Sequence, residues 1–153
     1  MTITITIGRS SVLSDIRVKS HAEAASISDA EERYIVEAGT EKLPEVHQCI
    51  TDAFAEVSAF VRPFITGSAS ATANDAYRSS GDLALALDIP TRKSIALATP
   101  LADAIHKYVV DSAMNKFYRA VSRPAMGEPH AQSLASDKAN IDVLLYTKQE
   151  PVY

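Results

Sequence analysis

The chain opens with an unbroken alternation of threonine and isoleucine from Thr2 to Ile7. In a β-strand successive side chains point to opposite faces, so the three isoleucines share one face and the three threonines share the other. All six residues are β-branched, the type that best suits a pleated surface. A single strand is not stable alone, and no strand of similar composition follows closely. This segment must therefore pair with a distant strand or with another chain.

The best partner within the chain is the segment 83–89. Leu83, Leu85, Leu87 and Ile89 alternate there with small or acidic residues, a pattern typical of a strand. Two paired strands still leave two open edges, which proteins normally protect. We therefore expect at least one of the two strands to lie against a neighbouring subunit or another protein of an assembled particle.

Three helices are predicted from apolar residues that recur every three or four positions. The first spans about Leu43 to Phe64 and is ended or kinked by Pro63. The second begins at Thr99-Pro100 and continues to about Val121. The third begins at Glu128-Pro129. The first two helices should pack together through one apolar face on each, made of Ile50, Phe54, Val57 and Val61 and of Ile105, Tyr108, Val109 and Phe117.

The remaining segments are less regular. A short helix over about 10–16 and a loop over 21–30 are expected, followed by a flexible loop at 67–81 and an extended C-terminal tail at 147–153. The predicted class is α+β and mainly helical. We expect one domain, residues 1–153, built from a bundle of about three helices with a small β element.

Composition narrows the function. The net charge of −4 argues against tight nucleic-acid binding, which needs a basic surface. No apolar run is long enough to cross a membrane. Cys49 is the only cysteine, so an intramolecular disulfide is impossible and a reducing, cytosolic compartment is expected.

No catalytic, cofactor or metal site is predicted. His47 and Cys49 lie two apart on a predicted helix and so on different faces, which favours surface histidines and a buried thiol. Asp103 and His106 are three apart, as a base and its orienting group would be, but more often form a solvated helix face. No phosphate-binding glycine motif occurs. We expect that the protein is not an enzyme.

Basic and aromatic residues near the end of the second helix have a structural explanation. Positive side chains stabilise the negative, C-terminal end of a helix dipole, which accounts for Lys116, Arg119 and Arg123. Contact with an acidic partner is the alternative explanation. Phe117 and Tyr118 are expected in the core rather than on a stacking surface.

The order of elements resembles a known class. After the N-terminal strand come Val61-Arg62-Pro63-Phe64-Ile65, the strand 83–89, a helix with Ile105-His106-Lys107-Tyr108 and Lys116-Phe117-Tyr118, and a last helix running into Asp142-Val143-Leu144-Leu145-Tyr146. This is similar to small structural proteins encoded near the head and tail genes of phages and prophages of gut Bacteroidota bacteria. In general form it resembles the head–tail connector, or adaptor, class, over about residues 1–151.

The resemblance implies a virion protein that is made in the bacterial host cytoplasm and located at the head–tail junction. Its partners would be copies of itself in a homo-oligomeric ring, the portal protein, and tail or other neck proteins, with no membrane involved. DNA would only pass through the ring, without sequence-specific binding. Acidic side chains suit such a conduit, because a basic lumen would hold phosphate. The candidate lining residues are Glu45, Asp52, Glu56, Asp103 and Asp111.

Two alternatives stay open at this point: a tail-completion or tail-terminator protein of the virion, and a small cytosolic ligand-binding or regulatory helical domain. The connector interpretation depends on assembly contacts in the N-terminal strand and near the tail, where aromatic residues can order a short segment on a neighbour. The candidate contacts are Thr2, Ile3, Thr4, Ile5, Thr6, Ile7, Tyr146, Lys148 and Tyr153.

Overall fold

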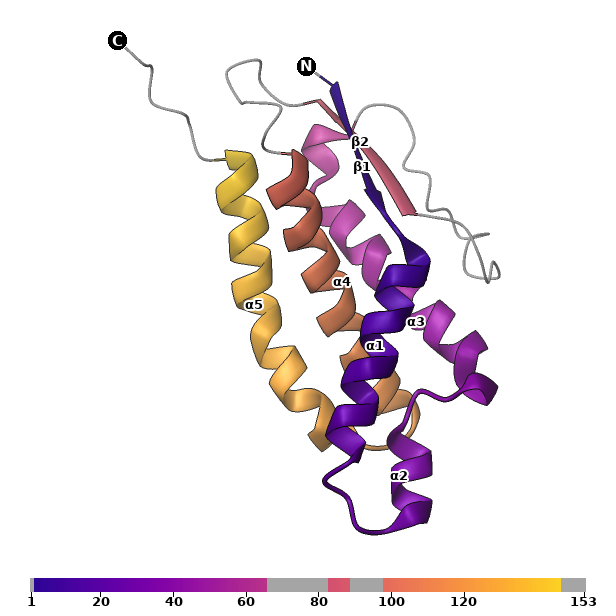
Figure 1. The fold of residues 1–153 in the computed structure, drawn as a ribbon. Coiled ribbons are helices and arrows are strands. Elements are labelled where there is room, and N and C mark those ends of the chain that lie inside the picture. Colours follow the sequence, from indigo (N-terminus) through magenta and orange to yellow (C-terminus); the bar gives the residue numbers. More distant parts are fainter. Residues whose placement is uncertain (1, 66–82, 89–97, 147–153) are drawn as a thin grey trace.

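The computed structural model describes residues 2–65, 83–88 and 98–146, drawn in colour in Figure 1. The predicted loop at 67–81 and tail at 147–153 lie outside these residues. The elements in chain order are β1 (Thr2–Ile7), α1 (Arg9–Ala24), α2 (Ala30–Val36), the 3₁₀ turn η1 (Thr40–Lys42), α3 (Leu43–Phe60), the 3₁₀ turn η2 (Arg62–Phe64), β2 (Leu83–Asp88), α4 (Ala98–Ala120) and α5 (Pro124–Tyr146).

The predicted class, α+β and mainly helical, is confirmed. The described residues form four long helices, α1, α3, α4 and α5, where about three were expected. Figure 1 shows these helices running side by side, with the two strands crossing one end of the bundle and α2 at the other end.

The two predicted strands pair with each other. β1 and β2 are antiparallel, with Ile5 opposite Leu85 and Ile7 opposite Leu83. These four side chains are buried in the same core as the helices, so the isoleucine face of β1 serves this chain. An isolated bridge between Ile65 and Leu87 occupies the far edge of β2. The far edge of β1 has no strand partner among the described residues.

Helix α1 is longer than predicted. The segment 21–30 was expected to be a loop, but the helix continues to Ala24. Its buried side continues at four-residue spacing through Val12, Ile16, Ser20 and Ala24. Ser20 and Ala24 are small and weakly apolar, so the sequence does not show this half of the helix as an apolar stripe. In the structure both residues are nevertheless buried.

The predicted pairing of the first two long helices is confirmed. α3 lies against α4, and all eight residues predicted for their contact are buried. α3 ends at Phe60, four residues earlier than expected, because Pro63 is accommodated in η2 instead.

Helix α5 begins at Pro124, four residues before the predicted start, and carries Pro129 inside it. Pro124 fits the first helical position, where its missing N–H costs nothing. Ser122, with φ of 60°, makes the sharp turn from α4. Gly127 then lies so close to α4 that an added Cβ would stand 2.8 Å from Oδ1 of Asn115 and 3.3 Å from its Cα. Glycine at this position lets the two helices approach closely.

Candidate functional site

The predicted assembly residues that the structure describes differ in exposure. On β1, Thr4 and Thr6 are exposed, whereas Ile5 and Ile7 are buried within the chain. Tyr146, at the last position of α5, is 55% exposed, and its ring meets that of Phe64 edge-on with centroids 5.0 Å apart. Lys148 and Tyr153 lie outside the described residues, and Thr2 and Ile3 are placed only as positions of β1.

The histidines were expected at the surface, and this is wrong for His47 and His130, which are both buried. The predicted burial of Cys49 is confirmed. Burial lowers the pKa of His47, with the charge of Arg9 acting in the same direction. Arg9 donates from Nη1 to the backbone oxygen of His47 at 3.4 Å and to Oγ1 of Thr51 at 3.1 Å, which ties α1 to α3.

Cys49 should be unreactive in the folded protein. Burial is the main cause that raises its thiol pKa to about 11, from an ordinary value of 9.0. At pH 8 the thiolate, which is the nucleophile, is then about a hundredfold rarer than in the unfolded chain. We expect iodoacetamide to modify native Cys49 at least about a hundredfold more slowly than Cys49 in guanidinium chloride. Mass spectrometry over time measures both rates, and equal rates would contradict the buried placement.

Asp103 and His106 do not act together. Nε2 of His106 contacts Oδ2 of Asp15 on α1 at 2.6 Å, while Asp103 is exposed on α4. The basic residues near the end of α4 are also dispersed. Lys116 forms an ion pair with Glu56 of α3, and the guanidinium of Arg123 bonds both oxygens of Glu32 on α2.

A buried charged network surrounds His130, and no sequence pattern predicted it. Its imidazole lies between two carboxylates, with Nε2 2.7 Å from Oε1 of Glu23 and Nδ1 3.2 Å from Oδ1 of Asp111. Carboxylates accept and do not donate, so a doubly protonated imidazolium fits both contacts. The hydrogen bond to Asp111 and the charge of Glu23 raise the pKa of His130 accordingly. Tyr118 also donates its hydroxyl to Glu23.

Lys107 extends this network to a second carboxylate. Its Nζ is 3.0 Å from Oδ2 of Asp111 and 2.6 Å from Oδ1 of Asp137. Both aspartate side chains are almost fully buried, whereas the lysine is half exposed. Oδ2 of Asp137 has no donor within the described residues. We call the five residues Glu23, Lys107, Asp111, His130 and Asp137 the charged network.

The two aspartates of the charged network have opposite protonation tendencies. Burial opposes ionisation of Asp111, but hydrogen bonds from His130 and others lower its pKa well below the ordinary range. Burial, together with the adjacent Asp111, raises the pKa of Asp137 to about 6. A proton on Asp137 would give its unpartnered oxygen a hydrogen bond to Asp111.

Asp111 was expected to face a channel, and this is wrong because its side chain is 6% exposed. Glu56 is also no free lining residue, since it accepts hydrogen bonds from Tyr108 at 2.8 Å and Ser112 at 3.2 Å in addition to its ion pair. In the structure Asp111 belongs to a run from Tyr108 to Met114 in which every residue is buried.

The charged network joins α1, α4 and α5, and the described pockets open elsewhere on the surface. Among the described residues, no group of three or more His, Cys, Asp or Glu side chains is arranged to hold a metal ion. Within the same residues, no helix combines the length and apolar character needed to cross a membrane. What the network can do chemically is hold the helices in register and exchange protons with solvent through Lys107 and Glu23.

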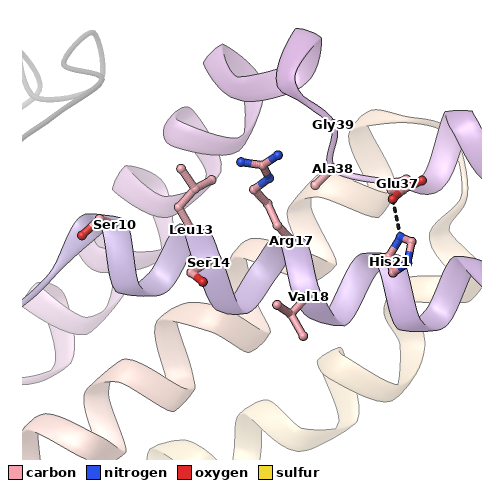
Figure 2. Close-up of a pocket in the computed structure, with 9 residues that line it drawn as sticks. All are labelled: Ser10, Leu13, Ser14, Arg17, Val18, His21, Glu37, Ala38 and Gly39. Atoms are coloured by element: carbon pink, nitrogen blue, oxygen red, sulfur yellow. Dashed lines mark hydrogen bonds and ion pairs between the residues drawn. The ribbon is translucent and has the colours of Figure 1, made fainter.

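A surface groove lies between α1 and the segment after α2 (Figure 2). Arg17 reaches into it from α1, and its guanidinium has no partner among the described residues. His21 and Glu37 face each other across it, with Nδ1 donating to Oε1 at 2.6 Å. A second pocket continues beyond this pair between α1 and α2, lined by Arg33 and Tyr34. We call the two pockets together the α1/α2 groove.

Comparison with known proteins gives no relative from which function could be transferred. No protein-family model, curated protein or solved structure matches this chain.

Proposed function

We propose that this chain is a structural protein of a phage virion, a subunit of the head–tail connector ring between portal and tail. The observation that carries the proposal is the far edge of β1, which has no strand partner within the described residues. Such an edge is a template for a strand of another chain, because its backbone N–H and C=O groups are available for pairing. The proposal also draws on the order of elements in the sequence that resembles connector proteins.

Partner binding at β1 would leave the fold of the subunit intact. Ile5 and Ile7 are already buried against the helices, so a partner strand would bind through backbone groups and meet Thr4 and Thr6 on the exposed face. Exposed acidic side chains such as Glu45, Asp52 and Asp103 would suit a surface past which DNA must slide.

Charges on the β1 edge should prevent partner binding. Lysine is one of the residues by which natural proteins block strand addition, and Thr4 and Thr6 are exposed positions on this strand. We expect Thr4→Lys/Thr6→Lys to reduce co-purification with the portal protein of the same phage at least about tenfold. The matched control, Thr4→Val/Thr6→Val, keeps β-branched residues of similar size and should bind like the parent.

The measurement is the mass of the portal complex with and without the protein, together with negative-stain images. Circular dichroism of each variant checks that the helices remain folded. A parent protein that binds neither portal nor tail proteins contradicts the proposal. Binding to tail proteins but not to the portal would favour a tail-completion or tail-terminator role.

A further inference from the structure

Four large apolar side chains are exposed on the described residues, two lining the α1/α2 groove and two near the end of α5. Val18 and Tyr34, 66% and 60% exposed, belong to the α1/α2 groove. Val143 and Tyr146, 59% and 55% exposed, lie three apart near the end of α5 and therefore share one side of that helix. Single exposed apolar residues are ordinary, whereas apolar side chains that gather on one polar-rimmed surface mark interaction sites.

The α1/α2 groove carries two guanidinium groups, beside the carboxylates of Glu37 and of Glu41, which hydrogen-bonds the side chain of Tyr34. Arg17 and Arg33 have no charged partner within the described residues, while Glu37 already accepts from His21. Nζ of Lys42 lies 4.8 Å from the centre of the Tyr34 ring and also donates to backbone oxygens at the end of α2. These contacts restrict the Tyr34 ring before any partner arrives, which lowers the entropy cost of binding.

The end of α5 has the complementary character. Asp142 stands next to Val143 and has no ion-pair partner among the described residues. The exposed Asp103 lies at the same level, because α4 and α5 are antiparallel and Lys107, one turn further along α4, contacts Asp137. Tyr146 is held by its edge-on contact with Phe64. This surface, the α5 end, is thus acidic with a fixed aromatic residue.

The α5 end cannot reach the α1/α2 groove of its own chain. Arg123 binds Glu32 of α2, so α5 starts beside α2. Its 23 residues then carry the chain about 34 Å away, at 1.5 Å per residue. Figure 1 shows α2 and the C-terminal end of α5 at opposite ends of the molecule.

We propose that the α5 end of one copy binds in the α1/α2 groove of the next copy. Tyr146 and Val143 would meet Tyr34 and Val18, and Asp142 would approach the free guanidinium groups. Because two different surfaces meet, the contact is heterologous, and such contacts produce rings when their rotation closes. The inference rests on the proposed connector function and specifies its lateral contact, whereas the β1 edge serves the portal or tail partner.

Two variants isolate the two surfaces. Arg17→Glu/Arg33→Glu disables the groove and leaves the α5 end intact. Asp142→Asn/Val143→Ala/Tyr146→Ala disables the α5 end by neutral truncation and leaves the groove intact. The control Lys19→Glu/Arg119→Glu makes the same change in net charge as the groove variant, at exposed positions outside both surfaces. Sedimentation velocity of the full chain, without portal, measures assembly, and circular dichroism checks folding.

Each disabled variant alone is expected to need at least about a tenfold higher concentration than the parent to assemble, while the control assembles like the parent. An equimolar mixture of the two disabled variants should form a 1:1 dimer and nothing larger. One intact groove then binds one intact α5 end. The two surfaces that remain in this dimer are both disabled, so no further copy can be added.

Three results would overturn the contact. The first is a parent protein that stays monomeric up to about 1 mM. The second is that the disabled variants assemble like the control. The third is that a mixture of the two folded variants gives no dimer. A groove variant that fails while the α5 variant assembles normally would mean a different occupant. If the contact between copies is absent but the protein still binds the portal, the proposed function stands and only the lateral contact is wrong. The failure of this inference can therefore be told apart from the failure of the proposed function.

Discussion

Replacing Phe54 with alanine is expected to lower the free energy of unfolding by about 3–5 kcal/mol. Phe54 is completely buried in α3 and belongs to the face that packs on α4. Truncation removes the ring from its apolar surroundings and leaves a cavity that close-packed helices can fill only in part. Urea or guanidinium unfolding, followed by circular dichroism, gives the difference.

The control for this substitution is Val18→Ala, at a position that is 66% exposed. It should change the free energy of unfolding by less than about 0.5 kcal/mol in the monomer. If Phe54→Ala shifted stability by under about 1 kcal/mol, the packing of α3 on α4 would be wrong.

Replacing Lys107 with methionine should destabilise the protein by about 2–3 kcal/mol at pH 8. Removing one partner of a fully buried ion pair costs about 3–5 kcal/mol, and the half-exposed ammonium of Lys107 reduces this figure. The substitution keeps the apolar stem but leaves Asp111 and Asp137 as adjacent buried carboxylates. At pH 5 the cost should be clearly smaller, because Asp137, with a pKa of about 6, is then protonated.

The measurement is denaturant unfolding of parent and variant at both pH values. Lys19→Met, at an exposed position of α1, is the matched control and should show no pH-dependent difference. A cost for Lys107→Met that is the same at pH 5 and pH 8 would show that the aspartates are not coupled.

The same groups give the parent protein a pH-dependent stability. The pKa of Asp137 is higher in the folded chain than its ordinary value of 3.8. Its contribution to the free energy of unfolding therefore falls as the pH rises from about 4 to 6. The raised pKa of His130 adds a loss as the pH rises above 6.5. Asp111, with a lowered pKa, acts in the opposite direction and loses its contribution below about pH 4. Stability should therefore be greatest in mildly acidic solution.

The sequence predicted the parts of the fold that depend on strong periodicity. The alternation in Thr2–Ile7 and Leu83–Ile89 predicted the two strands, and their pairing follows because each was the best partner available. The stripe that includes Phe54 predicted α3 and its contact with α4. The second half of α1 was missed, since its inward positions Ser20 and Ala24 look polar or neutral in the sequence.

The charged network could not be predicted, for a physical reason. Glu23 and His130 are 107 residues apart in the chain, and Lys107 and Asp137 are 30 apart. Charged residues on helices are usually solvated, so Asp111 was placed at the surface. Only the packing of α1, α4 and α5 shows that these side chains share one buried region.

The pairing of β1 with β2 has a consequence for how the protein is made. Ile7 lies 76 residues before its partner Leu83 in the chain. At synthesis rates of about 5–20 residues per second, β1 leaves the ribosome roughly 4–15 seconds before β2 exists. During that interval both edges of an isoleucine-rich strand are exposed in the crowded cytoplasm. We therefore expect the recombinant yield to depend on how fast the chain is translated.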